Sequence, residues 1–311
     1  MDLGIVIVSY NVRELTLGCL ASVYEALAHD ALAGHVWLVD NSSADGSAAA
    51  ARAAFPQATV IESGGNLGFA GGANIGLAAM ADLEPPPPYV LILNPDTLIA
   101  PGALGLMIRH LSAHPRTGLV GASLEYGDGG FQHGAFRFPT LAMAFLDFWP
   151  VNHRLTNSGL NGRYPRRRYE AGQPFPIDHP LGAAMMARWE AVRQVGPLDT
   201  SYFMYCEEID WCLRMRRAGW EICCVPEARI THFSGQSTAQ FRDRMFVALW
   251  RSRFLLFARF YSPAYQFLAR RIVRAGLRRD ARRVRQALRR HEIAPDDAAR
   301  RLEAFRQVME M

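Results

Sequence analysis

Asp96 is the first residue whose position suggests chemistry. It follows an apolar run in the stretch VLILNPDT, residues 90–97. A turn accounts for Asn94 and Pro95 but does not require a carboxylate after them. Mg²⁺ and Mn²⁺ often take only one or two protein carboxylates and complete their shell with water and phosphate oxygens. Asp96 is therefore an adequate metal ligand by itself, and a plain turn residue is the alternative.

A second group of carboxylates lies in CEEIDW, residues 206–211. Repulsion among neighbouring carboxylates raises the pKa of at least one of them, which suits a general base. The structural alternative is the acidic first turn of a helix, in which Asp210 pairs with Arg214 four residues later. We assign Asp210 to that structural role and take Glu207 and Glu208 as candidate catalytic residues.

His232 stands in THFSG, at the predicted end of a strand. A lone histidine there is most often a core or loop residue. Its neutral imidazole is also a common metal ligand, and it could bind the same ion as Asp96.

Asp40 and a glycine-rich stretch complete the set of candidates. Asp40 ends an apolar run and precedes Asn-Ser-Ser, which is typical of a helix cap but also suits contact with a base or a ribose. Residues 64–76, GGNLGFAGGANIG, contain six glycines. Such glycines allow close helix–sheet packing, or let backbone N–H groups approach a phosphate. Asn66 and Asn74 beside them favour contact with a nucleotide.

The elements that must position these residues alternate along the first part of the chain. Apolar runs predict strands at 3–10, 35–40, 58–63 and 89–94, and the segments around 13–28 and 66–80 predict helices. This order predicts an α/β fold, with a mostly parallel sheet flanked by helices. Ligands of such sheets bind beyond the carboxyl ends of the strands, where Ser9, Asp40, the glycine stretch and Asp96 all fall.

Charge divides the chain unevenly. All 34 basic residues are arginine; residues 239–311 hold 18 of them against 7 acidic residues, and residues 1–238 hold 16 against 22. This pattern predicts an acidic domain over 1–240, which holds the candidate catalytic residues, and a basic, helical extension over 241–311. A basic extension suggests an anionic partner, either nucleic acid or a membrane surface.

The compartment is indicated by three features of the sequence. The five cysteines form no CxxC pair, which is typical of a reducing compartment. The N-terminus enters an apolar run without a basic leader, and no apolar window of 18 residues lacks charge. We expect a cytoplasmic protein without a spanning helix.

The order of the motifs resembles the family 2 glycosyltransferases, in particular their rhamnosyltransferase-like branch. The matching stretches, within about residues 3–240, are VIVSYN, LVDNSSADGS, NLGFAGGANIG, LILNPDT, GAAMM, VGPLDTSYFMYCEEIDWCLRMRRAGW and ITHFSGQST. The resemblance implies a GT-A fold, which is Rossmann-like, together with a nucleotide-diphosphate sugar donor, a divalent metal and inversion at the anomeric carbon. The absence of QxxRW indicates a non-processive enzyme.

The resemblance also implies roles for single residues. Asp96 corresponds to the last Asp of the family's DxD motif, and Asn94 replaces the first. Mg²⁺ or Mn²⁺ would then bind Asp96 and His232. The family's Glu-Asp pair falls on Glu207-Glu208, which places the base at Glu208. The residues expected around the base, ribose and diphosphate of the donor are Ser9, Tyr10, Asp40, Asn66, Gly68, Asn74 and Asn94.

The basic extension fits an enzyme of this kind. Over 264–290 arginines mix with large apolar residues at helical spacing, as in a helix that lies on an anionic leaflet. Nucleic acid is not expected, because no base-reading module accompanies the arginines. The expected acceptor is a polyprenyl-linked or cell-surface glycan at the inner face of the plasma membrane.

Two alternatives accompany this interpretation. A sugar-nucleotide pyrophosphorylase would need a glycine-rich loop after the first strand, where SYNVRE stands instead. A non-catalytic nucleotide-sugar-binding protein on a degenerate GT-A fold is the other alternative, because Asn94 and Glu208 depart from the family pattern.

Overall fold

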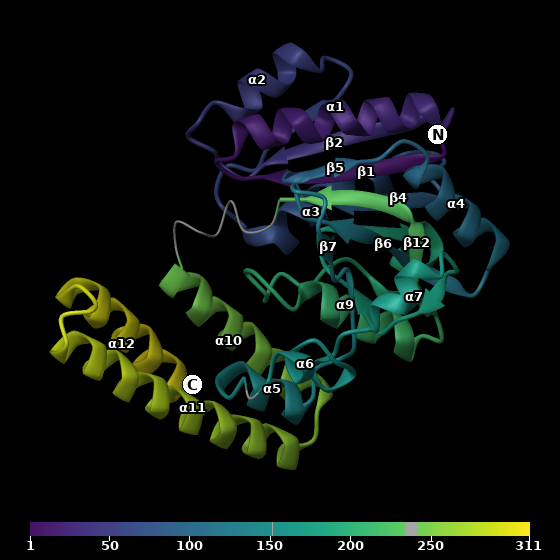
Figure 1. Cartoon of the computed structure of the whole chain (residues 1–311). Helices are drawn as coiled ribbons and strands as arrows, with labels where there is room; N and C mark the ends of the chain where they lie inside the picture. Colours follow the sequence, from purple (N-terminus) through teal and green to yellow (C-terminus); the bar gives the residue numbers. More distant parts are fainter. Residues whose placement is uncertain (151, 234–241) are drawn as a thin grey trace. The chain divides into compact units, whose positions relative to one another are not determined.

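The computed structural model describes residues 1–150, 152–233 and 242–311 (Figure 1). Residues 234–238, the last part of the ITHFSGQST motif, and the first residue of the predicted extension lie outside the described residues. The chain divides into two compact units. The first contains Met1–Arg137, Tyr164–Phe203 and the stretch from Glu207 through the last strand; the second contains Phe138–Arg163, Met204–Cys206 and the C-terminal helices.

The first unit is built on one large, mostly parallel sheet. Its strand order is β3-β2-β1-β4-β11-β6-β12-β5, with β7 paired to β6 and β9 paired to β12. The strands are β1 (Leu3–Ser9), β2 (Gly34–Asp40), β3 (Thr59–Glu62), β4 (Tyr89–Leu93), β5 (Thr97–Ile99), β6 (Thr117–Glu125), β7 (Phe131–Gln132), β9 (Phe175–Pro176), β11 (Ala184–Arg188) and β12 (Glu221–His232). A separate two-stranded sheet pairs β8 (Ala135–Phe136) with β10 (His179–Pro180).

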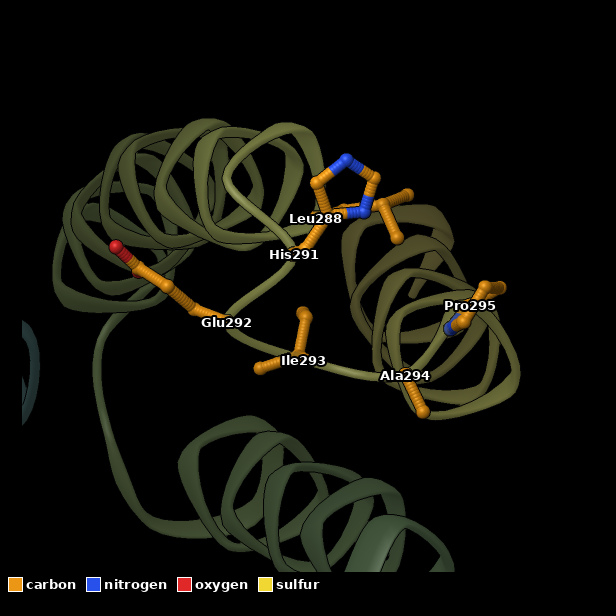
Figure 2. Close-up of a pocket in the computed structure, with 6 residues that line it drawn as sticks. All are labelled: Leu288, His291, Glu292, Ile293, Ala294 and Pro295. Carbon is orange, nitrogen blue, oxygen red and sulfur yellow. The ribbon is translucent and has the colours of Figure 1, made fainter.

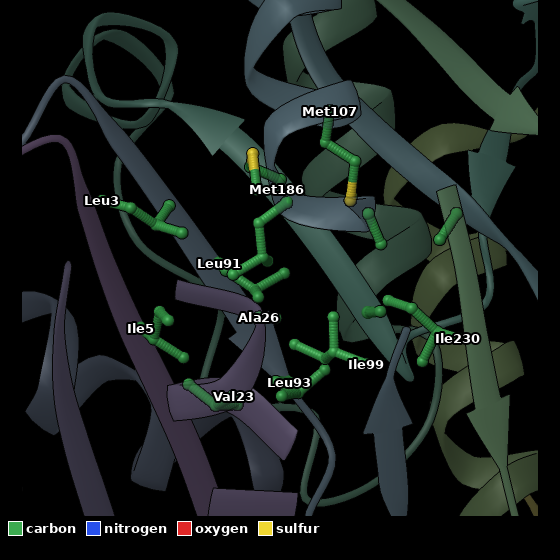
Figure 3. Packing of buried hydrophobic residues seen from close by; sticks show 14 of the residues in the cluster. Leu3, Ile5, Val23, Ala26, Leu91, Leu93, Ile99, Met107, Met186 and Ile230 are labelled. Carbon is green, nitrogen blue, oxygen red and sulfur yellow. The ribbon is translucent and has the colours of Figure 1, made fainter. Parts of the chain in front are cut away.

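Helices cover both faces of this sheet. They are α1 (Arg13–His29), α2 (Ser47–Ala54), α3 (Gly68–Ala81), α4 (Ala103–Ala113), α7 (Arg166–Glu170), α8 (Trp189–Val195) and α9 (Glu207–Arg217). Leu3, Ile5 and Ile7 of β1 belong to a core cluster with side chains of α1 and α4, as Figure 3 shows for Val23, Ala26 and Met107. The alternate residues Val6 and Val8 lie under α3, on the other face. Because side chains alternate along a strand, the fully apolar β1 requires cover on both sides.

The expected α/β class and the four parallel N-terminal strands are confirmed. The sheet becomes mixed at β11, which lies between β4 and β6 and runs antiparallel to both. β12 returns parallel to β6, with a register shift between Val225 and Arg229. Pro226 lies in that irregular stretch, where a missing backbone donor costs no ladder hydrogen bond.

The second unit is helical. It contains α5 (Leu141–Phe148), α6 (His153–Thr156), the short 3₁₀ helix η1 (Gly159–Asn161), α10 (Arg242–Phe260), α11 (Pro263–Arg289) and α12 (Pro295–Glu310). Its core joins Phe148 of α5 to Trp250 and Phe257 of α10 and to Val273 and Leu277 of α11. The segment Phe138–Arg163 thus belongs with the C-terminal helices. Among the residues that the structure describes, no helix has the length and apolar character needed to cross a membrane.

Candidate functional site

The carboxyl ends of β1 and β2 bring two predicted residues together. Ser9 and Asp40 are register partners, and the Asn41 N–H donates to the Ser9 carbonyl at 2.8 Å. The Ser9 hydroxyl is fully buried and lies 2.8 Å from Thr16 Oγ1. Tyr10 follows directly and is half-buried. Ser9 thus anchors α1 internally, while Asp40 and Tyr10 lie at the strand ends where a ligand of such a sheet binds.

Asp40 is buried, and only one of its two carboxylate oxygens accepts a hydrogen bond from the described residues. Its Oδ2 accepts the Ser43 N–H at 3.0 Å in a turn; Asp40 is not the helix cap that the sequence suggested, because α2 begins at Ser47 with Gly46 as its N-cap. Its Oδ1 is buried and has no hydrogen-bond partner among the described residues. A buried carboxylate oxygen without a donor is costly, so this atom is well suited to accept a ligand hydroxyl.

Asn41, which we did not select from the sequence, organises the glycine-rich loop. Its Oδ1 accepts the Leu67 N–H at 3.1 Å, and its Nδ2 donates to the Gly68 carbonyl at 3.0 Å and to Asn66 Oδ1 at 3.3 Å. Asn66 Oδ1 also accepts the Gly68 N–H at 3.0 Å. One amide therefore fixes the loop between β3 and α3. An Asx turn after β2 was the available sequence signal, but its partners lie 25 and 27 residues away.

Several glycines of this stretch serve helix–sheet packing. A Cβ at Gly72 or Gly76 would lie 2.6 Å from Val8 or Val6, so these glycines allow α3 to approach β1. Gly68 has a φ of +73°, and a Cβ there would collide with the Phe203 carbonyl oxygen. Both the backbone conformation and the neighbour require glycine at position 68.

Asn74 makes a structural contact within the first unit. Its Nδ2 donates to the Leu198 carbonyl at 2.7 Å, and its Oδ1 accepts the Leu198 N–H at 3.0 Å. This two-way pairing ties α3 to the segment after α8. The expected contact of Asn74 with a nucleotide stays a prediction, and the pairing argues against it.

Asp96 and His232 lie together at the edge of the sheet. The Phe233 N–H donates to the Asp96 carbonyl at 2.9 Å, and His232 is the register partner of Thr97. His232 Nε2 lies 3.4 Å from Asp96 Oδ1, and both residues are more than nine-tenths buried. Asp96 Oδ1 has no hydrogen-bond partner within the described part of the chain.

Gln132 fixes the other side of the imidazole. Its Oε1 lies 3.2 Å from His232 Nδ1, and both side chains are buried. An Nδ1–H that donates to Gln132 leaves Nε2 with a lone pair on the side of Asp96. Gln132 was not a sequence candidate, because only the pairing of β7 with β6 brings it near β12.

These two side chains suit a divalent cation. Asp96 offers an unsatisfied oxygen and His232 a nitrogen, and a buried hydrogen bond to the opposite ring nitrogen is typical of a ligating histidine. Within residues 1–150, 152–233 and 242–311, no group of three or more His, Cys, Asp or Glu side chains could enclose an ion. A cation here would therefore need further oxygens from water or substrate phosphates.

Glu207 and Glu208 open α9 but differ in environment. Glu207 is buried, its Oε2 lacks a hydrogen-bond partner among the described residues, and burial, with the Glu208 charge, raises its pKa well above the ordinary value. Glu208 is half-buried and runs along Gly182, where an added Cβ would lie 3.8 Å from the Cβ and Cγ of Glu208. The neutral form of Glu207 is thus favoured beside a more accessible Glu208.

Asp210 takes the structural role expected for it. It lies 2.6 Å from Arg214 Nε, and Tyr202 Oη donates to its other oxygen at 3.2 Å. This pair holds α9 against the preceding loop, because Arg214 also donates to the Val195 and Pro197 carbonyls.

A short segment before β11 connects the two halves of the site. The Asn94 N–H donates to the Ala183 carbonyl at 2.9 Å, and the neighbouring Gly182 packs against Glu208. The Asn94 carbonyl accepts from Thr97 Oγ1 at 2.7 Å, which closes the turn that presents Asp96. Residues 182–183 therefore lie between the Asp96 turn and the start of α9.

A surface pocket of about 350 Å³ lies elsewhere, at the turn from α11 to α12. Its lining includes His291 and Glu292, but Figure 2 shows these side chains pointing away from one another. The pocket therefore presents no convergent groups and is not a candidate site.

The fold is that of an α/β protein whose acidic pair and Asp–His pair are candidates for a site beyond the carboxyl ends of parallel strands, where ligands of such sheets usually bind. The family model described as "Glycosyl transferase family 2" matches residues 4–191. The N-acetylglucosaminyl-diphospho-decaprenol L-rhamnosyltransferase of Mycobacterium tuberculosis is 30% identical over 267 residues, which cover 82% of this chain and 85% of that protein.

Two solved structures show a similar fold. The mannosyltransferase PcManGT from Pyrobaculum calidifontis, in complex with GDP-Man and Mn²⁺, aligns with 99% of this chain and 86% of its own, at 17% identity and a TM-score of 0.54. GalNAc-T7 with UDP, GalNAc and Mn²⁺ aligns with 74% of this chain at 16% identity and a TM-score of 0.54, and the alignment spans 43% of the GalNAc-T7 chain. The chain belongs to glycosyl transferase family 2, as its motifs indicated.

Proposed function

We propose that this glycosyltransferase moves a sugar, with rhamnose as the first candidate, from a nucleotide diphosphate to a hydroxyl of a lipid-linked or cell-surface glycan, with inversion. The support for rhamnose and for a polyprenyl-diphosphate acceptor is the activity for which the M. tuberculosis relative is named. An N-acetylglucosamine linked through diphosphate to a polyprenol is therefore the first acceptor to test.

One observation carries the proposal. The described residues contain three buried carboxylate oxygens without a hydrogen-bond partner, namely Asp40 Oδ1, Asp96 Oδ1 and Glu207 Oε2. All three belong to residues that the motifs select, and Asp40 and Asp96 follow β2 and β4, the two strands that flank β1. Buried polar atoms normally have a hydrogen-bond partner, so oxygens without one on these motif residues favour a site that a ligand completes.

The donor would lie along the strand ends. Asp40 Oδ1 would accept a hydroxyl of the nucleoside, and Tyr10 would also contact the nucleoside. The loop that Asn41 fixes would provide backbone N–H groups around Asn66 and Gly68. Asp96 and His232 would hold a Mg²⁺ or Mn²⁺ ion, with Asn94 beside the donor. When bound, that ion would neutralise charge on the diphosphate.

Glu208 would act as the general base. It takes the proton of the acceptor hydroxyl, whose oxygen forms a bond to the anomeric carbon. The bond from that carbon to the diphosphate oxygen breaks on the opposite face, and the nucleoside diphosphate leaves with the electron pair. Glu208 is the better candidate of the pair, because a base must reach the hydroxyl and Glu207 is buried.

The test is a donor and acceptor screen on the purified full chain. Thermal unfolding is followed with dTDP-, UDP- and GDP-sugars in the presence of Mn²⁺, because a bound donor stabilises the folded state. The donor that raises Tm is then offered with the diphosphate-linked acceptor. Transfer with inverted configuration supports the proposal. Stabilisation by a donor without transfer to any glycan hydroxyl would favour the non-catalytic alternative.

We also propose that α11 docks on an anionic leaflet, which would bring the enzyme to its acceptor at the inner face of the plasma membrane. Ala269, Val273 and Leu277 of α11 are buried in the second unit. Phe267 and Leu268 are exposed, at 60% and 46%. The exposed arginines of this helix are seven, namely Arg271, Arg274, Arg278, Arg282, Arg283, Arg285 and Arg289. Apolar residues beside a basic stripe suit an interfacial helix.

Substitution of exposed arginines tests the docking of α11 on a membrane without changing the core of the helical unit. Changing Arg278, Arg282 and Arg285 to Gln should weaken binding to vesicles that contain phosphatidylglycerol by roughly a hundredfold, at about 1 kcal/mol per arginine. The control replaces Arg109, Arg193 and Arg216, which are exposed in the first unit. Equal loss in both triple variants would contradict a specific role for α11.

A further inference from the structure

Three arginines of the first unit lie over aromatic rings. The guanidinium carbon of Arg166 is 5.2 Å from the centre of the Phe131 ring, that of Arg168 is 5.7 Å from Phe175, and that of Arg137 is 5.7 Å from Tyr164. We call these six residues the arginine–aromatic patch. A guanidinium held over a ring is oriented by that contact and still has N–H donors for an anion.

The rings contact one another in one cluster, and this packing fixes the rings over which the arginines lie. Tyr169 joins two of them, with centroids 5.0 Å from Phe131 and 5.2 Å from Phe175, and Phe175 lies 5.6 Å from Tyr164. Tyr169 and Tyr164 are tied to the backbone, because their hydroxyls accept the N–H groups of Ala135 and Asp178 at 3.1 Å.

The positive charge of the patch is only partly balanced by the protein. Arg166 forms an ion pair with Glu170 at 2.9 Å, with more than half of each side chain exposed. Across the residues that the structure describes, Arg137 and Arg168 form no ion pair with a carboxylate. Residues 1–238 hold 22 acidic residues against 16 arginines, so a cluster containing Arg166, Arg167 and Arg168 is unusual for this region.

Short strands connect the patch to the elements that carry the candidate site. Phe131 is adjacent to Gln132, which contacts His232. After β7, the strand β8 pairs with β10, and β10 contacts α9, whose first turn contains Glu208. The same short strands therefore lead from the patch to both ends of the site. An acceptor whose hydroxyl reaches Glu208 would extend along these strands to bring its remaining groups to the patch.

We propose that the arginine–aromatic patch binds the diphosphate of the acceptor. This inference rests on the proposed function, in which the acceptor carries a sugar diphosphate and the diphosphate of the donor binds near Asp96. The planar guanidinium group of arginine can donate two parallel hydrogen bonds to two oxygens of one phosphate. These charge-assisted hydrogen bonds are about twice as strong as hydrogen bonds between neutral groups. Of the three rings, only that of Phe131 is half-buried rather than buried, and it would offer apolar contact to the sugar or to the first carbons of the lipid.

The experiment measures binding as well as transfer by the full chain. Binding of N-acetylglucosamine diphospho-farnesol is compared, by calorimetry, with binding of the neutral farnesyl N-acetylglucosaminide. Wild type should prefer the diphosphate compound. The Arg137→Gln/Arg168→Gln variant should lose that preference by roughly ten- to a hundredfold, with the Km for the donor unchanged. Arg193→Gln, an exposed arginine of the same unit, is the matched control.

The outcomes separate this inference from the proposed function. A double variant that keeps the wild-type preference for the diphosphate compound overturns the assignment of the patch. A raised Km for the donor with unchanged acceptor binding assigns the patch to the donor and also overturns it. If the preference is lost as expected but wild type transfers no sugar, the patch assignment holds and the proposed reaction is wrong.

Discussion

His232 Nε2 lies 3.4 Å from Asp96 Oδ1, with both side chains buried where β12 meets the turn after β4. The two residues are 136 positions apart in sequence, and the backbone bond from Phe233 to Asp96 holds them together. Asp96 Oδ1 has no hydrogen-bond partner within the described ranges. The pair thus presents an oxygen and a nitrogen to the same small volume, and this arrangement underlies the proposed metal role.

Replacing Asp96 with Asn tests that role while keeping the size of the side chain. We expect Mn²⁺-dependent donor binding to be lost and transfer to fall by at least about a hundredfold, because a ligand charge is removed beside the diphosphate. Calorimetric titration of Mn²⁺ in the presence of a nucleoside diphosphate measures the first effect. Unchanged Mn²⁺-dependent donor hydrolysis by Asp96→Asn would contradict the assignment.

Gln132 should affect the same site through His232. Removing its acceptor in Gln132→Leu should weaken Mn²⁺ binding by roughly ten- to a hundredfold, the usual range for partners of metal ligands. Gln132→Glu keeps an acceptor opposite Nδ1 and should retain most of the affinity. The readout is the Mn²⁺ dissociation constant. Equal affinities for wild type and Gln132→Leu would show that Gln132 does not orient the imidazole.

Glu207 should make folding stability depend on pH. Burial, with the Glu208 charge, raises its pKa well above the ordinary 4.5. Because the pKa of Glu207 is raised by folding, the stabilising contribution of Glu207 is complete at pH values below its pKa in the unfolded state. This contribution is lost as pH rises through its pKa in the folded state. Relative to Glu207→Gln, wild type should lose about 1.4 kcal/mol per pH unit above 4.5, until Glu207 ionises in the folded state.

Urea unfolding of both proteins between pH 4 and pH 9 measures this difference. The gap in unfolding free energy should widen with pH and then level off. A gap that stays constant across the range would show that the pKa of Glu207 is not raised by folding.

Gly276 tests the packing of the helical unit. A Cβ at this position of α11 would collide with the Phe148 ring of α5. Gly276→Ala should therefore lower the unfolding free energy, because overpacking costs about 1–3 kcal/mol and the gain in helix propensity is at most about 1 kcal/mol. In a Phe148→Leu background the same change should cost less. An equal cost in both backgrounds would mean that the ring is not the obstacle.

The parallel strands of the fold could be predicted because each of them is encoded by a short, continuous apolar run in the sequence. The apolar runs that end at Ser9, Asp40 and Leu93 are buried strands, as their composition indicated. Asp96 and His232 were selected by motif, and the structure brings them together. Asp210 and Arg214 pair as their helical spacing predicted.

Other residues could not be found from the sequence because their partners are distant. Gln132 contacts His232 across 100 positions, and Asn74 contacts Leu198 across 124. The antiparallel course of β11 depends on the topology between β4 and β6, which local patterns do not encode. Local patterns around Phe148 did not indicate a core, because its core contacts are with residues of α10 and α11, about 100 or more positions away.

The central claim is that Glu208 removes the proton of the acceptor. The most direct measurement compares Glu208→Gln with wild type for donor affinity and for the rate of sugar transfer at saturating donor and acceptor. We predict an unchanged dissociation constant for the donor and a transfer rate lower by roughly a hundred- to ten-thousandfold. Transfer by Glu208→Gln at close to the wild-type rate would contradict the account.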